Sequence, residues 1–331
     1  MYEAFYKNLH RFSVRKITLV FSALAVVVLG GVLLFSGRLP WGFERDIADS
    51  LHGQLVMTMT AANLVAPYVF DFNTGKLIHQ SKTEGVLLLQ STTASSTGDT
   101  AYRCMSETKI PQVCIYRLAT RSHHVISHNE YLLKRNLVWS PDEKSVLYVA
   151  SVATTTSASI DPNEWVVFRA MVDGSQETRV ATGSTAFFSP TGKSVFALQR
   201  DGLHEHDLAS STDRVAWPVT GGSANRFMTL AVSQDGTKLA WANPYSGPAG
   251  QQGKLSLFTV TSWHPFTLRF DTAVPLRVWQ MQFSPDGRAL ALSVDSSDKQ
   301  LGLYVYVLGS EPKKVLDLQA YERKTFISQW R

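Results

Sequence analysis

Gln282-Phe-Ser-Pro-Asp-Gly-Arg288 leads directly into the apolar stretch Ala289-Leu-Ala-Leu292, and the same order of residue types recurs in three other places. Each copy has an apolar segment, a turn of Pro, Asp and Gly types, and a second apolar segment. The other copies are Val138–Tyr148, Phe187–Ala197 and Ala231–Trp241. Pro presets φ at the first central position of a turn and Gly accepts a positive φ, so the pattern predicts two antiparallel strands joined by a tight turn.

The spacing of the copies indicates how much structure each repeat contains. The serine that opens each turn recurs every 44 to 51 residues, at Ser140, Ser189, Ser233 and Ser284. A weaker copy, Ser95–Tyr102, lies about one repeat earlier and lacks the proline. This period is typical of one four-stranded blade of a β-propeller. Five turns, and therefore five blades, are visible in the pattern.

The two ends of the chain supply complementary strands for a sixth blade. The C-terminal segment Phe326-Ile-Ser-Gln-Trp330 matches the strand before a turn, but no turn follows it. Near the other end, Leu55–Met59, Tyr68–Phe72 and Lys76–His79 read as three strands without that first strand. One C-terminal and three N-terminal strands would complete a blade. This closure removes exposed sheet edges and ties the termini together.

The repeated turn and the short apolar strand after it resemble the repeats of the TolB-type six-bladed propeller family. The resemblance covers about Leu51 to Arg331, and it implies an all-β fold of six four-stranded antiparallel blades. Three positions depart from the pattern: Glu143 stands at a turn glycine, Thr191 at the aspartate and Gln234 at the proline. These departures weaken single turns and leave the repeat intact.

A run without charged residues, Ile17 to Phe35, precedes the repeats. A run of this length is long enough to span a bilayer as a helix. Lys7, Arg11, Arg15 and Lys16 precede it, so the positive-inside rule predicts a single-pass anchor with a cytoplasmic N-terminus and an extracytoplasmic propeller, periplasmic or on the cell surface. The alternative is a cleaved secretory signal. The run is longer than the usual signal core, and no convincing small-x-small cleavage site precedes Pro40.

The sequence thus predicts four parts, namely a cytoplasmic basic tail (1–16), a transmembrane helix (17–36), a juxtamembrane linker (37–50) and a TolB-like propeller (51–331). The formal net charge is +5, of which the tail carries +3, so little basic excess remains for the propeller. Nucleic-acid binding needs a clustered basic face, and the remaining Lys and Arg are scattered among Asp and Glu. We therefore expect a membrane association and no nucleic-acid partner.

Cys104 and Cys114 are the only cysteines, and both fall in the weak first repeat. They stand on two expected strands joined around Ile110-Pro111-Gln112. If the strand register pairs them, their Cα separation suits a disulfide, which an extracytoplasmic location would permit. Two buried thiols that pack as small apolar groups are the alternative. The residues leave both alternatives open.

Other reactive residue types give no catalytic, cofactor or metal assignment. His123, His124 and His128, and His204 with His206, are expected to be solvated surface residues. Gly221-Gly-Ser223 lacks the strand-turn-helix context of a nucleophile elbow. The acidic pairs Asp46 with Asp49 and Asp295 with Asp298 are expected in solvated loops. The polar segments 152–159 and 243–252 both follow the second strand of a repeat, so they are expected to project from one rim.

These observations favour a noncatalytic function. The resemblance implies a membrane-anchored, extracytoplasmic propeller that acts as a protein-interaction scaffold in the cell envelope. The alternative is an envelope sensor or enzyme that binds a small molecule or a carbohydrate at the central channel. That alternative needs acidic or histidine side chains gathered at one channel mouth, and no such cluster recurs in one column of the repeats.

Overall fold

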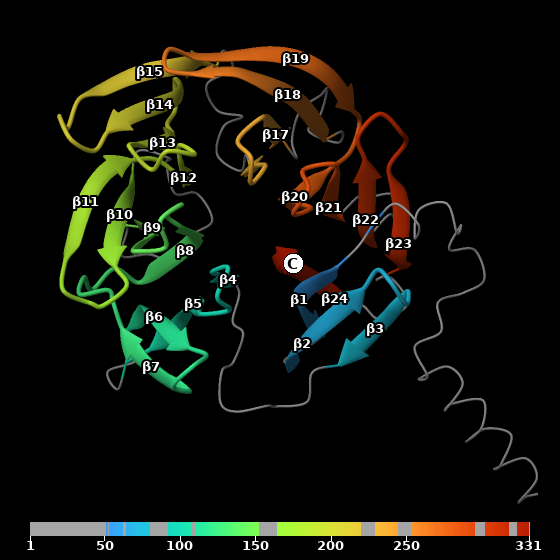
Figure 1. Cartoon of the computed structure of the whole chain (residues 1–331), viewed down its shortest axis with the longest axis horizontal. Helices are drawn as coiled ribbons and strands as arrows, with labels where there is room; N and C mark the ends of the chain where they lie inside the picture. Colours follow the sequence, from blue (N-terminus) through green and yellow to red (C-terminus); the bar gives the residue numbers. More distant parts are fainter. Residues whose placement is uncertain are drawn as a thin grey trace, which may run out of the picture.

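The structure is a computed structural model that describes residues 51, 53–61, 64–79, 92–106, 110–151, 164–219, 229–243, 253–294, 302–317 and 323–330. Every strand within these residues belongs to one of six four-stranded antiparallel sheets. The sheets stand as blades around a common centre (Figure 1). The prediction of an all-β, six-bladed propeller is therefore confirmed.

Five blades each use four strands that follow one another in the chain. Blade 1 contains β4 (Thr92–Ala94), β5 (Thr100–Met105), β6 (Pro111–Arg117) and β7 (Ser122–Val125). Blade 2 contains β8 (Leu133–Trp139), β9 (Ser145–Ser151), β10 (Trp165–Met171) and β11 (Glu177–Thr182). Blade 3 contains β12 (Ala186–Phe188), β13 (Ser194–Leu198), β14 (Gly202–Asp207) and β15 (Asp213–Pro218). Blade 4 contains β16 (Thr229–Val232), β17 (Lys238–Asn243), β18 (Lys254–Trp263) and β19 (Phe266–Val274). Blade 5 contains β20 (Val278–Phe283), β21 (Ala289–Val294), β22 (Gly302–Val307) and β23 (Lys313–Asp317).

Blade 6 joins the two ends of the chain, as the sequence predicted. It contains β24 (Arg323–Trp330), β1 (Gln54–Ala61), β2 (Leu64–Asp71) and β3 (Lys76–His79), in that order. The C-terminal strand pairs antiparallel with β1 from Leu55↔Trp330 to Ala61↔Arg323. It is also tied to blade 5, because the Ile327 N–H donates to Gln280 Oε1 at 2.8 Å. The ring therefore closes by pairing the first described strand, β1, with the last, β24.

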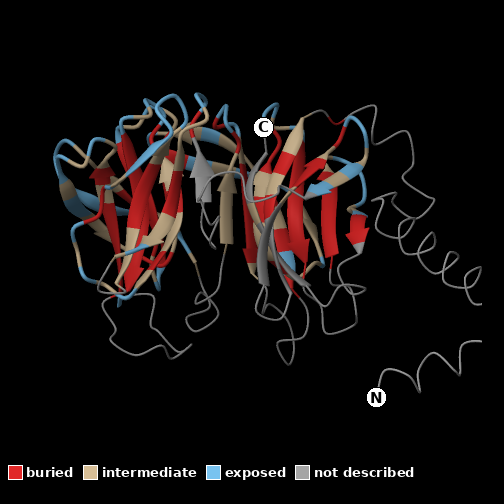
Figure 2. Ribbon diagram, turned by 90° about the horizontal axis from the view of Figure 1, so that it is seen from below, coloured by how far each residue is buried: buried red, intermediate tan, exposed pale blue. Residues whose placement is uncertain are grey.

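The first strand of each blade lies nearest the centre of the ring, and the fourth lies at the outside (Figure 1). We call the side that carries the turns between first and second strands the turn face; these turns are 95–99, 140–144, 189–193, 233–237 and 284–288. The connection face lies opposite and carries the described connections between blades, 126–132, 183–185 and 275–277. Figure 2 shows the turn face along its upper edge.

The serine that opens each turn is buried and bonds the turn from within. The Ser284 hydroxyl donates to Asp286 Oδ1 at 2.6 Å and accepts from the Ala289 N–H at 2.9 Å. The same two bonds recur in the turns that begin at Ser140 and Ser233. A buried hydroxyl without hydrogen-bond partners lowers the stability of the fold by about 1–3 kcal/mol, and these two bonds avoid that loss. Serine recurs at this position because its hydroxyl makes both bonds at once.

Adjacent turns contact one another around the ring. A Cβ on Gly236 would lie 2.2 Å from Pro190 Cγ, and one on Gly192 would lie 3.5 Å from Pro141 Cδ. Glu143, at a glycine position of the repeat, adopts a φ of 55°. Its Oε1 accepts a hydrogen bond from the Ser96 N–H of the preceding blade at 2.5 Å. The departure from glycine thus adds a link between blades 1 and 2.

The hydrophobic core is divided among the seams between blades. Within the described residues, five seams each hold a buried apolar cluster, between blades 1 and 2, 2 and 3, 3 and 4, 4 and 5, and 5 and 6. The second strands β9, β13 and β21 are buried along their whole length. A strand covered on both faces is expected to be continuously apolar, which explains the unbroken runs that follow each turn.

The predicted tail (1–16), membrane helix (17–36) and linker (37–50) lie outside the described residues. In the part of the chain that the structure does describe, no helix is both long enough and apolar enough to cross a bilayer. The membrane anchor therefore stays a prediction from the sequence.

Candidate functional site

A cavity of about 360 Å³ lies at the turn-face end of the seam between blades 4 and 5. We call it the 4–5 groove. Its lining combines strands β17 to β19 of blade 4 with β20, β22 and the following turn of blade 5, and includes Lys238, Leu257, Asp271, Thr272, Phe283, Tyr306, Leu308 and Gly309. The volume lies in the range of about 300–1,000 Å³ that is usual for ligand pockets.

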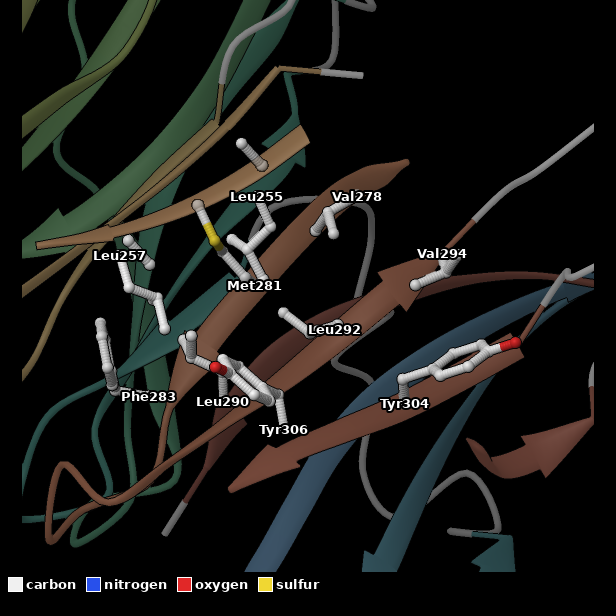
Figure 3. Close-up of a cluster of buried hydrophobic side chains, with 12 residues drawn as sticks. Leu255, Leu257, Val278, Met281, Phe283, Leu290, Leu292, Val294, Tyr304 and Tyr306 are labelled. Atoms are coloured by element: carbon white, nitrogen blue, oxygen red, sulfur yellow. The ribbon is translucent and has the colours of Figure 1, made fainter. Parts of the chain in front are cut away.

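The floor of the 4–5 groove continues the apolar cluster of this seam. Leu257, Phe283 and Tyr306 are buried members of that cluster (Figure 3). Burial raises the pKa of the Tyr306 hydroxyl above 10.0, although a hydrogen bond with the Gly309 backbone opposes the shift. The phenol is therefore neutral at physiological pH, and the floor presents hydrocarbon and aromatic surface.

One edge of the groove is charged. Thr259 Oγ1 lies 2.7 Å from both Lys238 Nζ and Asp271 Oδ2, and Lys238 Nζ lies 3.3 Å from the same carboxylate oxygen. Burial tends to raise the pKa of Asp271, but hydrogen bonds from Thr259 and Lys238 and the charges of Lys238 and Arg269 outweigh it, so the pKa is lowered. The edge thus offers an ionised carboxylate beside two cations.

Both charged side chains of this edge are reachable from solvent. The Lys238 side chain is 31% exposed and that of Asp271 is 25% exposed. A ligand in the groove can therefore place an apolar group on the floor while its polar groups meet an ammonium donor and a carboxylate acceptor. This arrangement suits reversible binding.

A second polar cluster lies at the seam between blades 3 and 4. The Glu205 carboxylate is buried, and it accepts hydrogen bonds from Ser194 Oγ at 2.9 Å and Arg214 Nε at 2.9 Å. His264, in the turn between β18 and β19, places its Nδ1 3.6 Å from Glu205 Oε1. Arg214 Nη2 also lies 3.0 Å from His264 Nδ1, so His264 links this blade 3 cluster to blade 4.

The third cluster surrounds Lys134, which is fully buried at the seam between blades 1 and 2. Its Nζ donates to the carbonyl oxygens of Pro111, Asn129 and Tyr131 at 2.6 to 3.0 Å. Burial lowers its pKa to about 8, with a smaller opposing effect of Glu177. Three carbonyl acceptors match the three donors of an ammonium group, so Lys134 acts as a structural cross-link.

The expectation of solvated surface histidines is wrong for His204. This residue lies on β14, the third strand of blade 3, and is 9% exposed. Its Nε2 lies 2.9 Å from Asp201 Oδ1 and its Nδ1 lies 3.1 Å from Asp213 Oδ2. The hydrogen bond with His204 is the main reason that the pKa of Asp201 is lowered. The expected outer strand is in fact covered by a fourth strand, β15, which explains the burial.

Two other histidines, His124 and His128, contact neighbouring backbone carbonyl groups. His124 Nε2 lies 2.6 Å from the Val172 carbonyl oxygen, and His128 Nε2 lies 3.0 Å from that of Gly174. His123 is exposed, as expected. No group of three or more His, Cys, Asp or Glu side chains within the described ranges has an arrangement that suits a metal ion.

Cys104 and Cys114 form a disulfide with a Cα separation of 5.9 Å. The register does not place them opposite each other, because Cys104 pairs with Gln112 and Cys114 with Tyr102. The two residues are diagonal neighbours on one face of the β5–β6 hairpin. Pro111 and Gln112, expected in the connecting loop, belong to β6.

Several sequence candidates lie outside the described residues. These are the Gly221-Gly-Ser223 stretch, the acidic pairs at 46 and 49 and at 295 and 298, the segment 152–159, and all but the first residue of the segment 243–252. The 4–5 groove, in contrast, was missed by sequence reasoning, because its lining comes from two repeats and carries no motif.

Comparison with known proteins gives similarity at the level of fold. Neither a protein-family model nor a curated protein matches the chain. The structure of TolB from Acinetobacter baumannii superposes with a TM-score of 0.55 at 18% identity, over 84% of this chain and 64% of that one. The chain is a six-bladed β-propeller structurally like TolB. It spans just under two thirds of the Acinetobacter chain.

Two further structures show how widely this fold is shared. The putative TolB from Agrobacterium tumefaciens gives a TM-score of 0.52 at 12% identity, over 85% of this chain and 99% of that one. An oligogalacturonate lyase in complex with manganese gives 0.53 at 11% identity, over 82% and 75%. Identities this low establish the propeller fold alone, and fold does not determine function.

Proposed function

We propose that this chain is a noncatalytic protein-interaction propeller, anchored in the membrane by residues 17–36 and displayed outside the cytoplasm in the cell envelope. The 4–5 groove carries the interaction part of the proposal, because it joins an apolar floor to a charged, solvent-accessible edge. An anchored interaction module needs a surface of this kind, where one buried side chain of the partner provides most of the affinity.

The occupant that this chemistry favours is an extended segment of a partner protein with one large apolar side chain. Leu257, Phe283 and Leu308 would surround that side chain, and Lys238 and Asp271 would bond the adjacent polar groups of the segment. A sugar is a poorer match, because its hydroxyl groups would meet hydrocarbon on the floor and lose their hydrogen bonds with water.

Two observations support the location. The Cys104–Cys114 disulfide is of a kind that persists in oxidising compartments such as the periplasm or the cell surface. The uncharged run at 17–35, with its basic excess on the N-terminal side, favours a cytoplasmic N-terminus and export of the propeller.

The interaction is tested by site-specific photo-crosslinking of the full-length protein in its own membranes. A photoreactive amino acid at Thr272, in the groove, is expected to capture one protein, whereas the same residue at the exposed Thr178 of blade 2 is expected to capture none. Leu308→Asp should remove the Thr272 adduct, because a carboxylate would enter the apolar site. Thermal unfolding of the Leu308→Asp protein verifies that it remains folded.

An adduct of equal yield from both positions, or one that persists in folded Leu308→Asp protein, would contradict the proposed groove interaction. Absence of any adduct at Thr272 would also contradict the proposed groove interaction.

The location is tested with a reporter enzyme fused after Arg331, one residue beyond the end of β24. We expect activity from a reporter that functions only outside the cytoplasm, because the propeller follows the predicted membrane helix. A matched fusion of a cytoplasm-active reporter should be silent. Cytoplasmic activity of the fusion would overturn the envelope location.

A further inference from the structure

Arg135 lies on β8, the innermost strand of blade 2, and its guanidinium has an unusual environment. The guanidinium carbon lies 3.9 Å from the centroid of the Trp165 ring. Among the described residues, its one hydrogen-bond acceptor is the Ser184 carbonyl oxygen, 3.3 Å from Nη2. A guanidinium has five N–H donors arranged as a planar fork. Most of this fork therefore has no acceptor within the described part of the protein.

The preceding residue, Lys134, differs from Arg135 in that all its donors have acceptors. Lys134 points into the opposite seam, where three carbonyl oxygens satisfy its three donors. Burial lowers the pKa of Arg135 to about 10, and no neighbouring carboxylate opposes that effect. Arg135 is thus a desolvated cation without an anionic partner among the described residues, and part of its surface remains accessible.

A second polar group beside Arg135 also lacks a partner. The Ser184 side chain is buried, and its Oγ has no hydrogen-bond partner within the described residues. Burying such a hydroxyl without a bond costs about 1–3 kcal/mol. Arg135 contacts the carbonyl oxygen of this same residue at 3.3 Å, so the unpaired hydroxyl belongs to the residue that the guanidinium touches.

The backbone around these groups is held in place. The Gly183 N–H donates to the Trp165 carbonyl and the Ser184 N–H donates to the Leu198 carbonyl, both at 2.9 Å. Asn136 Oδ1 accepts from the Ala186 N–H at 2.6 Å, which joins β8 to β12. These bonds join the backbone of Trp165 and strand β8 to the connection 183–185 and to β12.

We propose that Arg135 and Ser184 form a carboxylate-binding site at the seam between blades 2 and 3, on the connection face. A planar carboxylate accepts two parallel hydrogen bonds from a guanidinium fork, and one of its oxygens can also accept the Ser184 hydroxyl. The guanidinium is planar by itself, and the stacked Trp165 ring supports one of its faces. The site lies on the opposite face from the 4–5 groove and is independent of it.

A carboxylate of this kind belongs either to a small organic acid or to the free C-terminus of a peptide. The two sources are separated by titrating the folded protein with acetate, with acetyl-Ala-Ala carrying a free carboxylate, and with its C-terminal amide. Affinities are measured by ligand-observed NMR and calorimetry. Acetate binding alone indicates a small-acid site, and tighter binding of the dipeptide acid than of acetate indicates a C-terminus. The amide should not bind in either case.

Variants assign the binding to the two residues. Arg135→Gln should weaken binding roughly tenfold to hundredfold, because a charge-assisted bond contributes about 1.5–3 kcal/mol. Arg135→Lys retains the charge and loses the fork, so its affinity should fall between those of the wild type and Arg135→Gln. Arg179→Gln, at an exposed arginine on β11 of the same blade, is the matched control and should bind like the wild type.

The Ser184→Ala variant tests the role of the hydroxyl in ligand binding and in stability by two separate measurements. Without ligand, removal of the unpaired hydroxyl should leave the urea midpoint unchanged or raise it, whereas carboxylate affinity should fall roughly twofold to tenfold. The proposal is overturned if neither acid binds the wild-type protein, or if folded Arg135→Gln protein binds them as well as the wild type. A Ser184→Ala protein that is destabilised without ligand would also contradict it.

Discussion

Deletion of residues 325–331 is expected to abolish the single cooperative unfolding transition of the propeller. These residues form most of β24, which pairs with β1 along its length and contributes Ile327 to the seam with blade 5. Each lost backbone hydrogen bond removes about 1 kcal/mol, so the loss of a whole strand approaches the total stability of a domain, about 5–15 kcal/mol. Calorimetry and circular dichroism of the truncated chain measure the effect.

Two controls make this result specific to ring closure. Deletion of seven residues at the other end, 1–7, removes the same length of chain and should leave the transition unchanged. A synthetic peptide of residues 323–331 added to the truncated protein should restore part of the transition, because it can pair with the free edge of β1. Unchanged thermal unfolding of the truncated protein would contradict closure through β24.

Gly236→Ala is expected to destabilise the propeller by roughly 2–6 kcal/mol, which a shifted urea midpoint would show. Gly236 has a φ of +70°, and a non-glycine residue in this region costs about 1–3 kcal/mol. The added Cβ would also lie 2.2 Å from Pro190 Cγ and 3.2 Å from Trp263 Nε1. Overpacking of this kind adds about 1–3 kcal/mol, because a proline ring has little freedom to move away.

Gly309→Ala separates backbone strain from the contact between blades. Gly309 has a φ of +90°, but a Cβ there would meet no atom within 4 Å. The backbone conformation of Gly309 is at least as unfavourable for alanine as that of Gly236. The difference in the free energy of unfolding between the two variants therefore measures the clash with Pro190. Equal destabilisation of both would show that the turns of blades 3 and 4 do not constrain each other.

The sequence predicted the parts of this fold that are encoded locally. Pro, Asp and Gly specify the turns through their backbone preferences. The apolar segments that precede the turns form the first strands, which end at Trp139, Phe188, Val232 and Phe283. Closure through the chain ends was also predictable, because a strand without its turn and three strands without their first strand are both visible in the pattern.

Features that depend on strand register and on contacts between distant residues could not be predicted. The burial of His204 depends on the cover provided by β15, and its two ring nitrogens lie against Asp201 in a loop and Asp213 on that strand. The disulfide depends on a register that places Cys104 diagonal to Cys114. The 4–5 groove and the Arg135 site each combine residues that are separated by many positions in the chain and share no motif.

Closure through both termini also has a consequence for biosynthesis. The strand β1 ends at Ala61, and its partner β24 begins at Arg323. At about 5–20 residues per second, the ribosome delivers the partner on the order of tens of seconds later. The other five blades can form earlier, but blade 6 can be completed only when β24 has left the ribosomal tunnel. The nascent chain therefore carries an incomplete sheet from the appearance of β1 until β24 emerges, and the ring closes only after all five other blades have been synthesised.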